Sequence, residues 1–147
     1  MFERVLVANR GAVARRVIRA CHELGLESVA VYSEADAGAP YLEEASATFP
    51  LGGSRPRESY LNVAALERAI RATGADAVHP GYGFLAENAD FARAVIAAGA
   101  EWIGPAPQWL ETMGHKTRAR ALMAEHGLTV GRASEVLHDE PAALAAA

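Results

Sequence analysis

The sequence predicts an α/β fold in which a parallel β-sheet is covered on both faces, and three observations support this prediction. Short β-branched runs alternate with longer segments whose apolar residues recur with helical spacing. The runs are apolar throughout, which is typical of strands buried on both faces. Glycine and proline mark the breaks between the segments. Short strands separated by helices of ten or more residues call for parallel pairing through right-handed crossovers.

The first half of the chain predicts a strand, a helix and two further strands. Residues 4–8 (RVLVA) form the first strand, and from Gly11 the apolar positions follow one face of a helix that Gly25 ends. Residues 28–32 (SVAVY) form the second strand. After a loop rich in turn residues, a weak third strand is expected at residues 48–51.

The second half continues the alternation. Residues 60–73 form a helix that Ser59 caps and Gly74 ends, and residues 75–80 contain the next strand. A further helix then leads into the strand EWIG. Two residues are candidates for the N-cap of that helix: Asn88 and Asp90. The complete pattern is that of a Rossmann-like, doubly wound parallel sheet.

Ligands bind such sheets at the carboxyl ends of the strands. Four segments hold such positions: residues 9–11 (NRG), 33–36 (SEAD), 79–84 (HPGYGF) and 104–107 (GPAP). In the third segment, Gly81 and Gly83 flank Tyr82. Glycines let the backbone turn sharply and approach a neighbour while Tyr82 is displayed, although a purely structural turn is the alternative.

Composition limits the class of protein. The chain has 147 residues, 51% of them hydrophobic, which suits one domain. Cys21 is the single cysteine, so no internal disulfide forms, and a reducing compartment such as the cytoplasm is expected. The apolar run at the N-terminus is too short for a signal peptide or a membrane span. The net charge of −4 offers no general attraction to nucleic acid or anionic membranes.

Several kinds of site are disfavoured. Dinucleotide binding needs G-x-G-x-x-G after the first strand, where only Gly11 stands. The NRG segment could still hold an anion with its backbone N–H groups, but a tight turn made by Asn9 and Gly11 is the favoured interpretation. The five histidines lack metal-ligand spacing, so no metal site is expected. Cys21 lies on the apolar side of its helix and is expected to be an inert core thiol.

Two groups of basic residues remain open to interpretation. Arg15, Arg16 and Arg19 share the first helix, and the spacing of Arg19 and Glu23 permits an intrahelical ion pair. This group is either a solvated face or a subunit contact.

Lys116 lies near the start of a helix that follows Gly114 and is expected to turn Leu122 and Met123 toward the core. The helix dipole disfavours a cation there unless an anion such as phosphate compensates, and an exposed lysine without a ligand is the equal alternative.

Five segments carry a family resemblance: VLVANRGAVARRVIRACHELG, SVAVYSEAD, SYLNVAALERAIRATGADAVHPGYGFLAENADFA, WIGPAP and MGHK. Together they resemble the N-terminal domain of biotin carboxylase, the ATP-dependent component of acetyl-CoA, propionyl-CoA and pyruvate carboxylases. The resemblance runs from about residue 2 to residue 128. In that family, ATP with Mg²⁺ activates bicarbonate to carboxyphosphate, and the carboxyl group passes to N1 of biotin on a carrier protein. A separate carboxyltransferase then selects the acceptor.

The resemblance implies roles for particular residues. Lys116 matches the lysine that binds the phosphates of ATP, and Tyr82 and Gly83 match the loop that borders the biotin and bicarbonate site. Three positions match the family's homodimer interface: Arg16, Arg19 and Glu23.

The resemblance also implies a longer protein. Residues 1–114 would form the Rossmann-like domain, and residues 115–147 a helix and linker leading into an ATP-grasp domain, with Asp139 as the N-cap of a short final helix. The Mg²⁺-binding carboxylates and the catalytic residues belong to that second domain, so no complete catalytic site is expected here.

Three residues depart from the family pattern: Ala12 replaces a glutamate, Ala86 a serine and His115 an aspartate. Loss of the aspartate removes a good N-cap, at a cost of about 1 kcal/mol.

The sequence favours two functions. The first is an N-terminal domain or truncated form of biotin carboxylase, and the alternative is a stand-alone module that pairs with a full-length carboxylase subunit. A nucleotide-binding domain with its own ligand is a weaker third.

Overall fold

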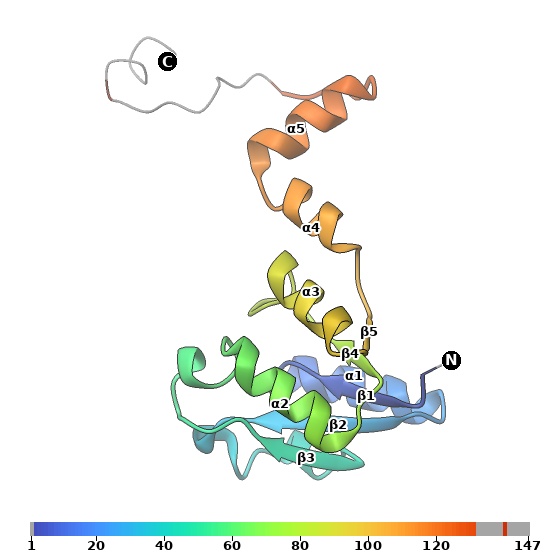
Figure 1. Cartoon of the computed structure of the whole chain (residues 1–147), viewed down its shortest axis with the longest axis vertical. Coiled ribbons are helices and arrows are strands. Elements are labelled where there is room, and N and C mark those ends of the chain that lie inside the picture. The colour runs from blue at the N-terminus through green and yellow to red at the C-terminus, as the bar shows by residue number, and fades with distance from the viewer. Residues whose placement is uncertain (1, 132–139, 141–147) are drawn as a thin grey trace.

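A computed structural model describes residues 2–131 and residue 140, and its centre is a sheet of five parallel strands (Figure 1). The strands are β1 (Arg4–Val7), β2 (Glu27–Tyr32), β3 (Ala47–Pro50), β4 (Ala77–His79) and β5 (Glu101–Trp102). Their order in the sheet is β3-β2-β1-β4-β5, and every neighbouring pair is parallel. The predicted α/β fold with a doubly wound parallel sheet is confirmed.

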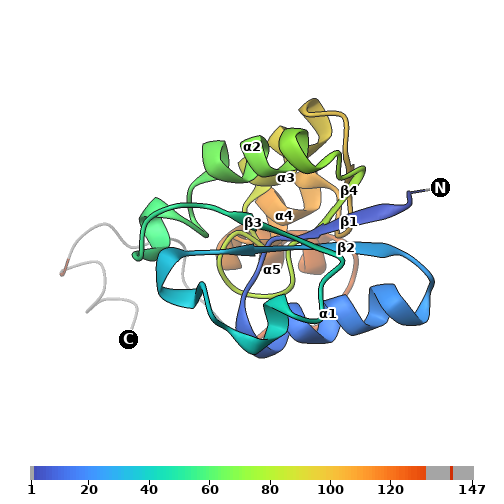
Figure 2. The same cartoon turned by 90° about the horizontal axis from the view of Figure 1, so that it is seen from below.

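Helices cover the two faces of the sheet unequally. Helix α1 (Gly11–Glu23) lies on one face, whereas α2 (Val63–Thr73) and α3 (Ala89–Ala97) lie on the other (Figure 2). Helices α4 (Pro107–Met113) and α5 (Lys116–Glu125) extend beyond the sheet from α3. Three 3₁₀ turns complete the described elements: η1 (Glu34–Asp36), η2 (Pro40–Leu42) and η3 (Pro56–Glu58). Over residues 2–131, no helix has the length and apolar character needed to cross a membrane.

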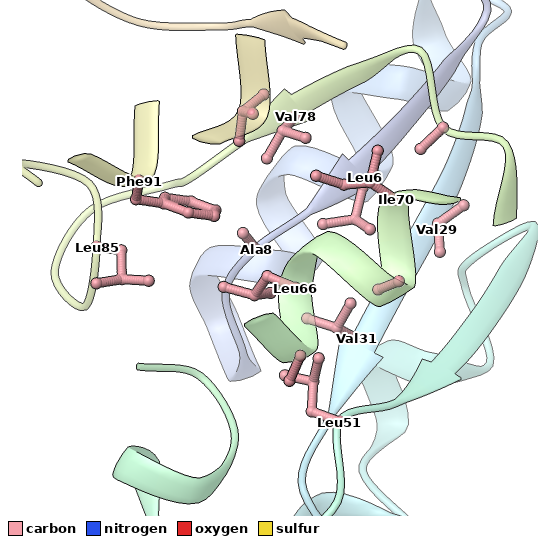
Figure 3. Close-up of a cluster of buried hydrophobic side chains, with 14 of the residues drawn as sticks. Leu6, Ala8, Val29, Val31, Leu51, Leu66, Ile70, Val78, Leu85 and Phe91 are labelled. Atoms are coloured by element: carbon pink, nitrogen blue, oxygen red, sulfur yellow. The ribbon is translucent and has the colours of Figure 1, made fainter. Parts of the chain in front are cut away.

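Alternation along the central strand β1 divides the core into two sides. Leu6 is paired in register with Val29 and Val78, and all three pack toward α2 and α3. Figure 3 shows this side, where Leu66, Ile70 and Phe91 point at the sheet. Val5 and Val7 face the opposite way, toward the buried side of α1.

The start of α2 differs from the sequence prediction. Helix α2 begins at Val63, and the Asn62 side chain accepts a hydrogen bond from the Ala65 N–H at 3.1 Å, so the prediction of Ser59 as the cap is wrong. The reason is the turn η3 just before it: Ser59 is buried there and donates to the Arg55 carbonyl at 2.8 Å. The other end is as expected, with Gly74 in the left-handed region at φ 65°.

Of the two candidate caps of α3, Asn88 is the cap, because its side chain accepts from the Phe91 N–H at 2.8 Å, whereas Asp90 lies within the first turn. Sequence periodicity missed α4, which has only seven residues and begins with Pro107. A helix this short is stable only through packing, and α4 contacts both α3 and α5.

Helix α5 begins at Lys116, as predicted, but does not reach the core. Leu122 and Met123 are only half-buried and no residue of α5 is fully buried, because the helix packs on α4 and not on the sheet. Its N-cap residue, His115, makes no side-chain hydrogen bond to the helix. The expected helix after Asp139 lies outside the described residues.

An ion-pair clamp fastens α1 to the segment after η2. Glu44 accepts hydrogen bonds from Arg15 Nε at 2.6 Å and from Arg19 Nε at 2.8 Å. Arg19 therefore pairs with Glu44, and the intrahelical pair with Glu23 that the spacing permits is not formed among the described residues. The two arginines, Arg19 first, lower the pKa of Glu44 to about 2.

We expect His115→Asp to increase the helical population of α5. A carboxylate at this position can accept from the free N–H groups of the first turn, which is worth about 1 kcal/mol. The measurement is the Cα chemical shift across residues 116–119 by NMR. His115→Ala is the matched control, because it also lacks a cap and should leave the shifts unchanged. Equal shifts in His115→Asp and the parent chain would contradict the assignment of His115 as an unsatisfied cap.

We expect the Glu44 carboxyl carbon to titrate at about pH 2, against a usual value of 4.5. A carboxyl whose pKa is lowered by folding stabilises the folded chain above pH 4.5, and this contribution is lost as the pH falls through about 2. Arg19→Gln should move the NMR midpoint back up. Arg16→Gln, on the same helix but without a contact to Glu44, should not. A midpoint near 4.5 in the parent chain would show that the clamp does not form in solution.

Candidate functional site

The carboxyl ends of β1 and β4 lie side by side because the two strands pair in parallel, with Val7 opposite His79. This pairing brings the NRG segment that follows β1 against the HPGYGF segment that follows β4. The pairing continues one residue further, since the Ala8 N–H donates to the His79 carbonyl at 2.9 Å. The candidate site is therefore the loop after β4, supported by the segment that follows β1.

Asn9 connects the two segments. Its side-chain Nδ2 donates to the Pro80 carbonyl at 2.7 Å and to the Tyr82 carbonyl at 2.9 Å, and its Oδ1 accepts from the Arg10 N–H at 2.9 Å. Asn9 is buried. The favoured interpretation, a tight turn made by Asn9 and Gly11, accounts for only part of this arrangement. Sequence reasoning missed the contact to the 79–84 loop, which joins residues more than 70 positions apart.

The loop adopts a backbone that ordinary residues avoid. Gly81 has φ 67° and Gly83 has φ 74°, both in the left-handed region. Phe84 follows at φ 43°, which is strained for a residue with a side chain. Gly81 also has no room for a Cβ, since an added atom would lie 2.6 Å from the Val13 side chain and 2.7 Å from Asn9 Nδ2. Gly83 has open space around it, so its conformation alone requires glycine.

Tyr82, between Gly81 and Gly83, is therefore displayed on the surface, where the residue is 75% exposed. On the far side, Phe84 stacks on Tyr60 with ring centres 5.1 Å apart and an interplanar angle of 22°. Phe84 therefore anchors the end of the loop even though its backbone is strained.

Tyr60 belongs to a buried polar network that sequence reasoning did not find. Its hydroxyl donates to Asp36 Oδ2 at 2.6 Å, and Ser33 Oγ donates to the same oxygen at 3.0 Å. Arg10 pairs with the other carboxylate oxygen at 2.5 Å. Burial, followed by the Asp36 contact, raises the pKa of Tyr60. The only sequence signal was the position of Ser33 and Asp36 at the end of β2.

A pocket of about 590 Å³ opens beside the loop, between α1 and the strands. Gly81, Tyr82 and Arg16 line one part of it. The rest is largely apolar, with a lining that includes Phe2, Val5, Val17, Leu26 and Ile103.

His79 lines the same pocket. Its Nδ1 accepts from the Gly81 N–H at 2.9 Å, so the ring proton of the neutral form is on Nε2. Burial lowers the pKa of His79, which favours the neutral ring. Cys21 also borders this pocket but is buried in the α1 side of the core, and burial raises the pKa of its thiol. The predicted place of Cys21 in the core is confirmed, and the inertness of its thiol stays a prediction.

The remaining predicted site residues lie in different places. Arg16 is exposed on α1 and shares the pocket lining with Tyr82, whereas Arg19 is engaged by Glu44. Glu23 is exposed at the last position of α1. Lys116 is exposed at the first position of α5, which lies beyond α4 and away from the sheet (Figure 1). The chain thus groups Tyr82 with Arg16 and places Lys116 on a separate element.

Comparisons with known proteins point to one family. Residues 1–110 match the family model described as biotin carboxylase, N-terminal domain. The chain is 55% identical over 121 residues, 82% of its length, to the biotin-dependent acyl-coenzyme A carboxylase alpha3 subunit of Mycobacterium leprae, and it covers 20% of that protein. It is 46% identical over 145 residues, 98% of its length, to the biotin carboxylase of Halalkalibacterium halodurans, of which it covers 32%.

A solved single-chain, multi-domain long-chain acyl-CoA carboxylase superimposes with a TM-score of 0.94 at 43% identity. That alignment covers 99% of this chain and 14% of the carboxylase. The chain therefore spans between a fifth and a third of the two curated relatives, and a smaller share of the solved carboxylase. From the family model and these relatives we conclude that the chain belongs to the biotin carboxylase N-terminal domain family.

Proposed function

We propose that this chain serves as the N-terminal domain of an ATP- and bicarbonate-dependent biotin carboxylase, acting together with an ATP-grasp domain. The observation that carries the proposal is the display of Tyr82, 75% exposed on a loop fixed at both ends at the carboxyl edge of the sheet. Such edges are where ligands bind in this class of fold. Tyr82 and Gly83 would form one wall of the site for biotin and bicarbonate.

The exposed face of Tyr82 suits a compact ring such as that of biotin. Aromatic side chains bind by apolar contact while the hydroxyl keeps a polar partner or water. Gly83 leaves the neighbouring space open, since a Cβ there would meet no atom within 4 Å. The residues present therefore fit biotin as a bordering surface.

Lys116 would contribute to binding ATP. It is exposed at the first position of α5, where the helix dipole favours an anion and an unpaired cation is disfavoured. A phosphate group there would satisfy both the ammonium group and the free N–H groups of the first turn. ATP supplies the phosphoryl group that activates bicarbonate for transfer to N1 of biotin. The ATP-grasp domain would provide the ligands for Mg²⁺.

The apolar pocket between α1 and the strands supports a role within a longer chain. Phe2, Val5 and Ile103 line it together with residues of α1. An exposed apolar surface of this kind commonly marks a contact with another part of a protein or with a partner. Because the relatives are three to five times longer, we assign this face to the part of such a chain that follows the present domain. A biotin carrier protein and a carboxyltransferase would complete the assembly in the cytoplasm.

The exposed face of α1 supports a second candidate, a module that pairs with a full-length carboxylase subunit or with its own copy. Arg16 and Glu23 are exposed on this helix, and Leu24 just after it is 74% exposed. Arginine beside an exposed apolar residue is a common feature of interfaces. Arg19 contributes less to this face than the sequence suggested, because the Arg19 guanidinium is paired with Glu44.

A chimera tests the proposed function. Residues 1–131 of this chain would replace the matching segment of the biotin carboxylase from Halalkalibacterium halodurans, its 46% identical relative. We expect bicarbonate- and biotin-dependent ATP hydrolysis by the chimera and none by the 147-residue chain alone. A folded but inactive chimera, or turnover by the chain alone, would refute the proposal.

Within this chimera, Lys116→Ala should raise the KM for ATP by about tenfold, because a charge-assisted contact to phosphate is lost. Arg118→Ala provides the matched control, since it removes an exposed cation from the same helix. Equal KM values for the two variants would remove Lys116 from the nucleotide site.

The second candidate makes a separate prediction. Arg16→Glu should weaken co-sedimentation of this chain with a full-length biotin carboxylase, because the charge at the centre of the α1 face is reversed. Arg68→Glu, exposed on α2 at the opposite face of the sheet, should leave it unchanged. Absence of a complex with the parent chain, or equal loss in both variants, would exclude pairing through α1.

A further inference from the structure

Every hydrogen-bond donor of the Asn9 side chain has a partner. Both hydrogens of its amide are used, one on the Pro80 carbonyl and one on the Tyr82 carbonyl, at 2.7 and 2.9 Å. Its oxygen is held by the Arg10 N–H at 2.9 Å. Rotating the amide by 180° would place its oxygen against two carbonyl oxygens, so only one orientation is favourable. Asn9 is 2% exposed, and water cannot replace these contacts without opening the site.

The two carbonyls depend on Asn9 in turn. Among residues 2–131, no backbone N–H donates to the carbonyl of Pro80 or of Tyr82. The left-handed residues Gly81, Gly83 and Phe84 turn the chain so that both carbonyls point to the same side, where Asn9 lies. The absence of a Cβ at Gly81 permits this approach, because an added Cβ would lie 2.7 Å from Nδ2.

The neighbouring residue, Arg10, secures the other end of the loop indirectly. Arg10 pairs with Asp36, Asp36 accepts from the Tyr60 hydroxyl, and Tyr60 stacks on Phe84. Two consecutive residues of the turn after β1 therefore hold the loop on both sides of Tyr82. Tyr82 itself remains exposed between them.

We propose that Asn9 is a positioning residue for carboxylation: its amide fixes the backbone of the 79–84 loop in the pose that presents Tyr82 to biotin. The contact with biotin rests on the proposed function, whereas the fixing of the loop does not. Asn9 acts through Tyr82 and touches neither biotin nor bicarbonate. The NRG segment thus supports a binding loop.

The fixing of the loop is tested in the 147-residue chain by ¹⁵N relaxation. In the parent chain, the amides of Gly81, Tyr82 and Gly83 should have order parameters of about 0.85, as in rigid backbone. In Asn9→Ala and in the isosteric Asn9→Asp at neutral pH, these values should fall to about 0.6 or lower. A loop that stays rigid in both variants would overturn the proposal.

Asn9→Asp adds a signature that a general loss of packing would not give. Burial against two carbonyl oxygens should raise the pKa of the new carboxyl above its usual value of about 3.9. Below that pKa the protonated acid regains one O–H donor, so rigidity of the loop should return in part as the pH falls. Asn9→Ala should show no such recovery. A pH-independent loop in Asn9→Asp would count against the hydrogen bonds as the cause.

Two glycine variants keep the test valid if changes at Asn9 unfold the chain. Gly81→Ala forces a Cβ toward Asn9 Nδ2 and should expose the Asn9 side-chain amide protons to solvent exchange. Gly83→Ala strains the same type of backbone but meets no atom within 4 Å, and should leave those protons protected. Equal exchange in the two variants would overturn the proposal.

The link to biotin is tested in the chimera described above. Asn9→Ala should raise the KM for biotin by about tenfold, because two hydrogen bonds are lost, while the KM for ATP stays unchanged. An unchanged KM for biotin would overturn the positioning role even if the loop becomes mobile. A chimera that is inactive with native Asn9 would instead refute the proposed function, and the relaxation result would still decide whether Asn9 holds the loop.

Discussion

Two hydrogen bonds from one buried amide connect the end of β1 to the loop after β4, and the candidate site depends on them. The Asn9 side chain supplies both donors, to the Pro80 and Tyr82 carbonyls. Each such bond contributes about 1 kcal/mol, but leaving a buried carbonyl unsatisfied costs about 1–3 kcal/mol. The arrangement therefore penalises other loop conformations more strongly than it stabilises the observed one.

This constraint explains the composition of the loop. Fixing a residue's backbone costs about 1–2 kcal/mol in entropy, and glycine has the most freedom to lose. Gly81 is required because its backbone approaches Asn9, and Gly83 because of its left-handed conformation. The stacking of Phe84 on Tyr60 offsets the strain that follows. The backbone that carries the exposed Tyr82 is thus held in one place before any ligand binds, which lowers the entropy lost on binding.

The sequence predicted features that depend on neighbouring residues. The order of the strands and of helices α1, α2, α3 and α5 was correct, whereas α4 was missed. Asn88 was one of two candidate caps for α3, the end of α2 at Gly74 was correct, and the HPGYGF segment was correctly placed at a strand end. Contacts between distant segments had no local signal. The link from Asn9 to Tyr82 requires β1 and β4 to pair, and the Asp36–Tyr60 contact requires the turn η3 to fold over β2. The same limit explains why Arg19 was matched with Glu23, four residues away, and not with Glu44.

The most direct test of this account uses the unmodified chain. Scalar couplings across hydrogen bonds, measured by NMR in a ¹³C,¹⁵N-labelled sample, report which nitrogen donates to which carbonyl. The account predicts couplings from Asn9 Nδ2 to the carbonyl carbons of both Pro80 and Tyr82. If neither coupling is present while those of the β1–β4 pairing are observed, the sheet forms without the two Asn9 hydrogen bonds, which contradicts the role of Asn9 in fixing the loop.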